Sequence, residues 1–345
     1  MKYFKKLSLL LSLLCLSLSG QEVESVDFLS TYNIPGISIR AIEVTGVHSL
    51  WFAGSKGRYG RIIKEKFEID SIVHMGRLPE FRSIASNGEY VFLLSIENPA
   101  LMYKIDPAKP LGNYELVYEE NDPKVFYDSM KFFDTKNGLA MGDPIENCLS
   151  VIRTNDGGQN WTKLPCLNIP EINKGEAAFA ASNSNISTFK NKSWIVSGGT
   201  KARVFRSEDY GENWQVSETP IIQGDKMTGI FTVDFYNSKV GIIMGGNWED
   251  KSDGHASKAL SLDGGKTWNL IAQNGLPGYI SCVKFVPDAS SKQLLATSTE
   301  GIYYSSDLGN NWKLIEKNGY YSLSFIDKNT AWVSKNEEIA KIKLQ

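Results

Sequence analysis

One short pattern recurs four times along this 345-residue chain and constrains its fold more than any other feature. Each copy has a hydroxyl residue, an Asp two positions later, a Gly two positions after the Asp and a Trp three positions after the Gly. The copies lie 44 to 54 residues apart, which is typical of the blades of a β-propeller. The Asp and Trp of the four copies are Asp156 and Trp161, Asp209 and Trp214, Asp263 and Trp268, and Asp307 and Trp312.

The pattern has a structural interpretation as the turn of a β-hairpin. The second copy, for example, lies between the apolar residues Val204 and Phe205 on one side and Val216 on the other. The Asp and the hydroxyl can accept hydrogen bonds from backbone N–H groups of the turn, and the Gly permits a positive φ. A calcium loop would need acidic residues at alternate positions and a later Glu, and the pattern lacks both. We therefore predict that the repeated Asp and Trp residues are structural.

Apolar segments at regular intervals predict the inner strand of each blade. They begin at seven positions, and blades three to six carry the repeated turns. We expect an all-β protein with a single seven-bladed β-propeller over residues 20–345. The last blade is short, and residues 24–30 can supply its missing outer strand, so that the two chain ends share that blade. The seven starting residues are Arg40, Arg82, Asp128, Glu176, Phe231, Ser281 and Tyr321.

The N-terminus has the features of a signal peptide covering residues 1–19. A basic start at Lys2 precedes an apolar run over residues 7–18, and the small residue Ser19 lies at the expected cleavage position. Cys15 follows Leu14, where a lipoprotein signal needs a small residue, so soluble export is favoured over a lipid anchor. We expect a periplasmic or extracellular protein.

Charge and composition exclude several classes of partner. The formal net charge is −2, which favours neither nucleic acid nor an anionic membrane surface. No segment after the signal peptide is apolar enough to span a bilayer. An aromatic content of 11% fits packed sheets and argues against disorder.

Three cysteines follow the predicted signal peptide: Cys148, Cys166 and Cys282. Cys148 and Cys166 are equidistant from Gly157 at the first repeated turn, so they would face each other across the hairpin. They can form a disulfide in an oxidising compartment or remain two buried thiols, and both alternatives stay open. No Cys/His cluster indicates a zinc or haem site, and we expect no cofactor. The histidines are scattered at His48, His74 and His255.

Propeller ligands bind in the axial funnel, where the inner strands begin. Arg40, Arg82, Asp128 and Glu176 would converge there with Tyr321. One interpretation is that arginine–carboxylate pairs satisfy a polar channel, since unpaired buried charge is costly. The other is a site for an anionic or sugar-like ligand, to which Arg203 can also contribute.

Loops that follow the second strands of several blades can cover one face of the ring. Gly142-Asp143-Pro144 lies at the end of one of these strands, and we interpret it as a structural turn. The segment Asn247 to Ala256 is polar and long for a blade hairpin.

The repeated turns resemble the Asp-box, or BNR, repeats of sialidases and sortilin-type proteins. A longer resemblance covers about residues 36–344 and is carried by four phrases, at residues 138–145, 175–182, 202–207 and 229–231. Together they are similar to a group of bacterial exported proteins classed with the photosystem II assembly and stability factor. Members of that group are often labelled oxidoreductase or glycosyl hydrolase. The resemblance implies a non-catalytic binding or assembly platform for a protein partner or small ligand. We expect this platform to be a monomer.

The alternative function is a sialidase-like glycoside hydrolase acting through Asp128 and Glu176, with Tyr321 nearby. The Arg-Ile-Pro phrase typical of the first sialidase arginine is missing. A two-carboxylate glycosidase also needs its carboxylates free of arginine and about 5–10 Å apart. For an oxidoreductase, the sequence lacks a G-x-G-x-x-G nucleotide fingerprint.

Overall fold

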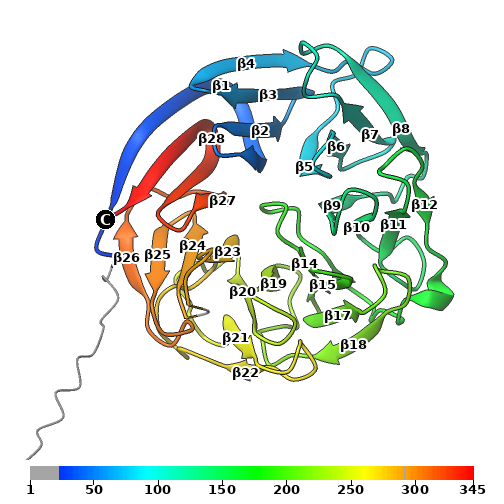
Figure 1. The fold of residues 1–345 in the computed structure, drawn as a ribbon. Coiled ribbons are helices and arrows are strands. Elements are labelled where there is room, and N and C mark those ends of the chain that lie inside the picture. The colour runs from blue at the N-terminus through cyan, green and yellow to red at the C-terminus, as the bar shows by residue number, and fades with distance from the viewer. Residues whose placement is uncertain (1–22, 291) are drawn as a thin grey trace, which may run out of the picture.

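Antiparallel β-sheets stand side by side around a central axis in the computed structural model, which describes residues 23–290 and 292–345 (Figure 1). The predicted signal peptide at residues 1–19 lies outside these described residues. One short 3-10 helix, η1 (Cys166–Asn168), lies between two of the sheets in sequence. The all-β class predicted from the alternating strand and turn signals is confirmed.

Hydrogen bonding joins the described strands into six sheets. The first contains β1 (Val26–Gly46), β2 (Ser49–Gly54), β3 (Arg58–Ile63), β4 (Lys66–Ser71), β27 (Ser322–Asp327) and β28 (Thr330–Leu344). The second contains β5 (Phe81–Ser86), β6 (Val91–Ser95), β7 (Ala100–Ile105) and β8 (Tyr114–Glu120). The third contains β9 (Tyr127–Phe132), β10 (Gly138–Gly142), β11 (Ser150–Thr154) and β12 (Thr162–Lys163).

The remaining three sheets complete the ring. The fourth contains β14 (Ile186–Phe189), β15 (Lys192–Val196), β17 (Arg203–Ser207) and β18 (Gln215–Glu218). The fifth contains β13 (Glu176–Ala177), β16 (Gly198–Gly199), β19 (Thr228–Phe235), β20 (Gly241–Asn247), β21 (Lys258–Ser261) and β22 (Asn269–Leu270). The sixth contains β23 (Cys282–Phe285), β24 (Leu294–Ser298), β25 (Gly301–Ser305) and β26 (Lys313–Glu316).

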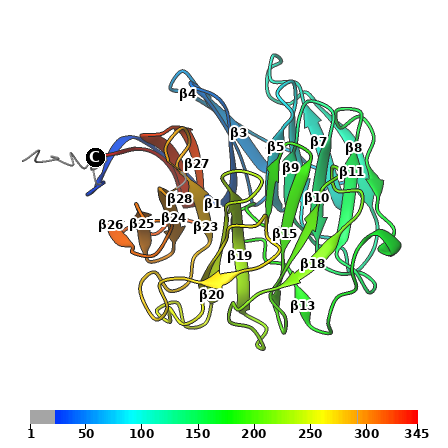
Figure 2. The same cartoon turned by 60° about the horizontal axis from the view of Figure 1, so that its bottom comes forward.

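The predicted count of seven blades is wrong, because the strands form a six-bladed β-propeller with six sheets. The cause is β1, a continuous strand of 21 residues. Its first part pairs with β28, from Val26 opposite Leu344 onward, and its second part pairs with β2. The strands expected to form separate first and last blades are therefore hydrogen-bonded into one six-stranded sheet. Figures 1 and 2 both show the blue β1 and the red β28 side by side.

The inner strand predicted to begin at Glu176 is also displaced. Glu176 lies in the two-residue β13, which pairs with β16 in the fifth sheet, and the inner strand of the fourth sheet is β14. Residues 178–185, here called the central segment, connect β13 to β14 and reach into the middle of the ring (Figure 1). Asn183 holds this segment against β5 and β9. Its side chain donates a hydrogen bond to the Ile84 carbonyl at 2.7 Å and accepts one from the Met130 amide at 3.1 Å.

The repeated turns owe their shape to their own polar side chains. In the first turn, Thr154 Oγ1 accepts from the Gly158 amide at 2.9 Å, and Asp156 Oδ1 accepts from the Gln159 and Asn160 amides at 3.0 Å each. Gly158 has a φ of +82°, in the region that favours glycine. In the other three turns, the Ser hydroxyl and the Asp carboxylate accept equivalent hydrogen bonds from backbone amides.

The core lies between neighbouring sheets, and the repeated tryptophans fill part of it. Trp161 packs edge-on against Phe92 of β6 and Phe132 of β9, with ring centroids 6.1 and 5.7 Å apart. Trp268 shares a buried cluster with Trp194 of the preceding sheet. Each of these tryptophans therefore joins two sheets.

Cys148 and Cys166 are bonded, with their sulfur atoms 2.02 Å apart. Of the two alternatives that the sequence left open, the structure has the disulfide. It joins the end of the loop after β10 to the first residue of η1. Cys282 is a buried free thiol.

Candidate functional site

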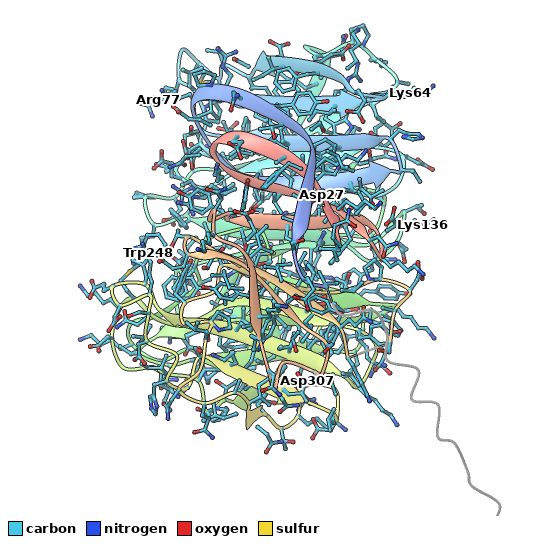
Figure 3. All side chains as sticks on the ribbon, turned by 90° about the vertical axis from the view of Figure 1, so that its left-hand side faces the viewer. Asp27, Lys64, Arg77, Lys136, Trp248 and Asp307 are labelled. Carbon is cyan, nitrogen blue, oxygen red and sulfur yellow. A yellow bond between two sulfur atoms is a disulfide. The ribbon has the colours of Figure 1, made fainter. Side chains whose placement is uncertain are left out.

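A pocket of about 360 Å³, here called the axial funnel, opens on the face of the ring where the inner strands begin. Arg40, Arg82 and Phe231, predicted at strand starts, all line it. Trp248 also lines the funnel, and Figure 3 shows Trp248 and Arg77 on the opposite face of the ring from Lys64 and Lys136. Residues 178–181 of the central segment line it as well.

Arg40 is held in place by the backbone and by an aromatic ring. Its Nη1 donates to the Ala181 carbonyl at 3.2 Å, and its Cζ lies 4.1 Å from the centre of the Tyr321 ring. Its Nε atom is buried without a hydrogen-bond partner. Burial lowers the pKa of Arg40, and the neighbouring positive charge of Arg82 lowers it further. Among the described residues, no carboxylate forms an ion pair with Arg40.

Arg82 lies beside Arg40 and is only loosely paired. Its Nη1 donates to the Ala180 carbonyl at 3.4 Å. Its Nε lies 3.6 Å from Glu80 Oε1, too far for a hydrogen bond. Two guanidinium groups therefore converge at one pocket, and each has N–H donors that are not used in hydrogen bonds within the protein. This arrangement binds carboxylates.

Aromatic side chains also line the funnel. Phe179 of the central segment stacks on Phe231 with ring centroids 4.0 Å apart. Tyr279 meets Phe231 edge-on at 4.8 Å, and Trp248 meets Tyr279 edge-on at 5.2 Å. The funnel can therefore bury an apolar group beside a negatively charged one.

Two carboxyl groups lie in or next to the funnel. Asp143 lines it and accepts a hydrogen bond from the Ala178 amide at 2.8 Å. Burial raises the pKa of Asp143 to about 6, although this hydrogen bond acts in the opposite direction. Asp128 is fully buried, and neither of its carboxyl oxygens has a hydrogen-bond partner. Burial, and then the negative charge of Asp143, raise the pKa of Asp128 well above its usual value, against the attraction of Arg82. Burial therefore favours the protonated, uncharged form of Asp128.

Glu176 and Arg203 form a separate buried ion pair instead of joining the funnel. Arg203 Nη2 lies 2.7 Å from Glu176 Oε2, and Arg203 Nε lies 2.9 Å from Oε1. Ser197 also donates to Glu176 Oε1 at 2.6 Å. This differs from the expected ring in which Glu176 and Asp128 would pair with Arg40 and Arg82. The reason is that Glu176 lies in β13, at the edge of the fifth sheet, and does not begin an inner strand.

The other predicted residues lie beneath the funnel. Tyr321 lies under the Arg40 guanidinium, and Ser281 Oγ donates to the Tyr321 carbonyl at 2.8 Å. Sequence reasoning did not assign Asp143 or Trp248 to the site. Both lie in the loops after second strands that the sequence marked as able to cover one face, and that placement was the available signal.

Within residues 23–290 and 292–345, no group of three or more His, Cys, Asp or Glu side chains is placed to hold a metal ion. Over the same residues, no helix has the length and hydropathy needed to cross a membrane.

Comparison with known proteins gives one curated relative and several structural ones. No protein-family model matches the chain. A probable oligoxyloglucan-reducing end-specific xyloglucanase of Neosartorya fischeri is 27% identical over 192 residues. That match covers 50% of this chain, and the chain spans only 22% of the length of that relative.

The structural relatives share the fold over almost the whole chain. YCF48 bound to a D1 peptide matches with a TM-score of 0.65 and 13% identity, covering 94% of this chain and 97% of that one. YCF48 from Cyanidioschyzon merolae matches with a TM-score of 0.63 and 13% identity, covering 92% and 98%. U3-55K matches with a TM-score of 0.62 and 13% identity, covering 94% and 100%. At these identities the likeness establishes a shared β-propeller fold and nothing further.

Proposed function

We propose that the axial funnel binds an acidic segment of a protein partner, so that this propeller acts as a binding or assembly platform. The observation that carries the proposal is the convergence of Arg40 and Arg82 in an open pocket. Each has a buried Nε without a hydrogen-bond partner, and Arg40 forms no ion pair among the described residues. Leaving buried donors unmatched costs free energy, which a carboxylate ligand would recover.

The shape and walls of the funnel fit a peptide. The pocket volume of about 360 Å³ suits a few side chains, and the stacked Phe179 and Phe231 offer an apolar surface beside the arginines. YCF48, a structural relative, has been captured with a bound D1 peptide, which supports a peptide ligand for this fold. Peptides carry both acidic and apolar side chains, so one segment can contact both the arginines and the aromatic rings of the funnel.

The glycoside hydrolase alternative gains little from the geometry. The curated relative is named as a xyloglucanase, but this chain spans 22% of its length. Glu176 is fixed to Arg203, and both side chains are buried, while Asp128 is closed off from the surface. Neither carboxyl group lines the funnel, so neither reaches a sugar bound there.

Export to an oxidising compartment is part of the proposal. The basic and apolar N-terminal residues support it, and so does the Cys148–Cys166 disulfide, because such bonds persist mainly outside the cytosol. Fractionation of cells that express the chain, followed by N-terminal sequencing of the product, tests export and the cleavage after Ser19.

Replacement of the funnel arginines should weaken binding of an acidic peptide. We expect Arg40→Ala and Arg82→Ala each to raise the dissociation constant of a labelled Glu/Ser peptide about tenfold, since each removes charge-assisted hydrogen bonds. Fluorescence anisotropy with the full chain measures the effect. Arg77→Ala is the matched control, because Arg77 is an exposed arginine on the same face and does not line the funnel (Figure 3).

The uncharged Gln/Ser counterpart of the peptide should bind at least tenfold more weakly than the Glu/Ser peptide, because it lacks carboxylates for the arginines. Equal affinity for the two peptides, or an equal loss in Arg77→Ala and Arg82→Ala, would show that the funnel does not select acidic segments. Thermal melts of each variant separate lost binding from lost folding.

Binding should also strengthen as the pH falls from about 7 to about 5. The pKa of Asp143 is raised to about 6, so its carboxylate is ionised at pH 7 and repels an acidic ligand, and it becomes neutral below pH 6. The carboxylates of the peptide stay largely ionised over this window, because their usual pKa is about 4.3. Anisotropy titrations at several pH values measure the change. Asp143→Asn should remove most of this dependence, and an unchanged pH profile in that variant would assign it to another group.

A further inference from the structure

A second cavity, here called the basal pocket, lies on the other side of the central segment from the axial funnel. Its volume is about 310 Å³, at the lower end of the range for ligand sites. Residues 178–181 line the funnel, whereas Ser182 and Ser184, further along the central segment, line the basal pocket. Glu43 and Asp234 also line it, and each lies three residues beyond a funnel residue on the same inner strand, Arg40 and Phe231.

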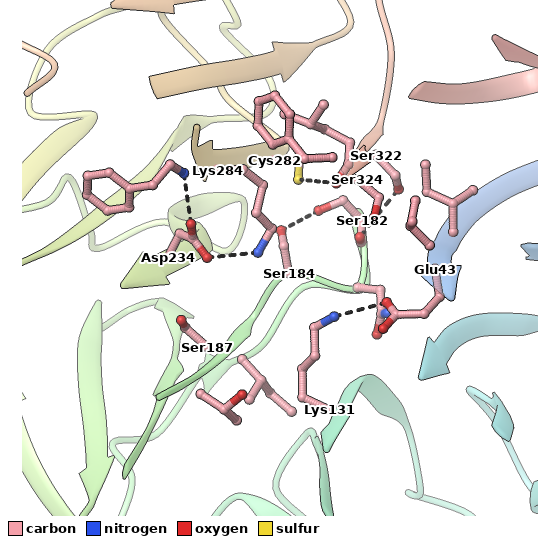
Figure 4. A pocket seen from close by; sticks show the side chains of 18 of the residues that line it. Glu43, Lys131, Ser182, Ser184, Ser187, Asp234, Cys282, Lys284, Ser322 and Ser324 are labelled. Carbon is pink, nitrogen blue, oxygen red and sulfur yellow. Dashed lines mark hydrogen bonds and ion pairs between the residues drawn. The ribbon is translucent and has the colours of Figure 1, made fainter. Parts of the chain in front are cut away.

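Two ion pairs face each other across the basal pocket (Figure 4). Lys131 Nζ lies 3.0 Å from Glu43 Oε2, and Lys284 Nζ lies 3.0 Å from Asp234 Oδ1. The four side chains are 16–27% exposed, so a ligand can reach them. Their formal charges cancel. Each ammonium has three N–H donors and uses one in its ion pair, which leaves two available.

Hydroxyl groups and aromatic rings complete the lining. Ser182 and Ser184 lie between the two ion pairs in Figure 4 and are hydrogen-bonded to each other. Ser324, half-buried, adds a hydroxyl from the β27 side. Phe325, half-buried, also lines the pocket and supplies apolar surface. The pocket therefore presents closely spaced donors and acceptors together with apolar surface.

We propose that the basal pocket binds a neutral polyhydroxylated ligand with the chemistry of a sugar. An anion would meet the carboxylates of Glu43 and Asp234, and a cation would meet the ammonium groups of Lys131 and Lys284. An apolar ligand would strip water from four charged groups without replacing its hydrogen bonds. Hydroxyl groups both donate and accept, so they can satisfy the spare ammonium N–H donors and the carboxylate oxygens together. The C–H face of a sugar ring would pack on a phenylalanine.

Saturation-transfer NMR on the full chain, with glucose, galactose and N-acetylglucosamine as probes, tests the proposal, and calorimetry gives the dissociation constants. We expect at least one of these sugars to bind, and Lys131→Met to weaken that binding about tenfold, because it removes charged donors. Lys136→Met is the matched control, since Lys136 is an exposed lysine on the same face and does not line the pocket (Figure 3).

Ser324→Ala is a second test that leaves both ion pairs intact, and it should weaken sugar binding severalfold without a change in the thermal melt. Binding of none of the three sugars, or equal affinity in wild type, Lys131→Met and Ser324→Ala, would overturn the proposal. So would tighter binding of glycine, because a zwitterion would then be the better match to the two ion pairs. Binding of acidic peptides at the axial funnel is measured separately by anisotropy, and its result neither supports nor contradicts sugar binding at the basal pocket.

Discussion

Replacing Arg203 with Met should lower the free energy of unfolding by about 3–5 kcal/mol, because it leaves the charge of Glu176 buried and uncompensated. The side chain of Glu176 has no exposed surface and that of Arg203 is 7% exposed, so water cannot replace the lost partner. Glu176 would retain only neutral donors, among them the Ser197 hydroxyl. Urea unfolding at neutral pH, monitored by tryptophan fluorescence, measures the change.

The double variant Glu176→Gln with Arg203→Met separates the buried charge from lost packing. The amide that replaces the carboxylate would keep an oxygen for the Ser197 hydroxyl but carry no charge, so we expect the double variant to recover a large part of the loss. Lys192→Met serves as the control at an exposed pair, since Glu208 in that pair is 65% exposed, and it should cost no more than about 1 kcal/mol. A double variant no more stable than Arg203→Met alone would contradict the charge-burial explanation.

Truncating a repeated tryptophan should have an effect of similar size. Trp214 is 7% exposed and packs in a cluster with Leu139 and Met141 of the preceding sheet. Its Nε1 donates to the Gly211 carbonyl at 3.0 Å within the turn. We expect Trp214→Ala to cost about 3–5 kcal/mol of stability, since it opens a cavity between two sheets. Thermal and urea unfolding of the purified variant give the value.

Trp312 offers a comparison within the same chain. It occupies the same position of its turn, yet it is only partly buried. Trp312→Ala should therefore cost less than Trp214→Ala. Equal and small losses in both variants would show that the tryptophans do not join the sheets.

The local structure of the repeated turns was predictable because each hydrogen bond that shapes a turn joins residues no more than four positions apart, as between Thr154 and Gly158. The β-strand content was also predictable from local sequence patterns. The number of sheets depends instead on contacts between distant residues. The sequence predicted that residues 24–30 join the end of the chain, and β1 does pair with β28. It did not show that the same strand continues past Ser38, which lies opposite Asn336 almost 300 positions away, into the pairing with β2.

The candidate site was predictable in part. Arg40, Arg82 and Phe231 reach the funnel because each lies on an inner strand, in β1, β5 and β19 respectively. Glu176 does not, because Phe179 and the alanines around it form the central segment in place of a strand. The segment Glu176-Ala-Ala-Phe-Ala has the apolar composition of an inner strand, so composition alone could not distinguish the two outcomes. Asp143 and Trp248 enter the funnel from loops, whose path depends on the rest of the ring.

The pairing of β1 with β28 sets an order of events during synthesis. Residues 26–33 are synthesised about 300 residues before their partners at 338–344. At about 5–20 residues per second, the interval is on the order of tens of seconds. Throughout that time the first strand carries an unpaired backbone edge, which is a template for pairing with other chains. The ring can therefore close only after residues 338–344 have been made, and until then the edge of the early strand must be kept from pairing with other chains.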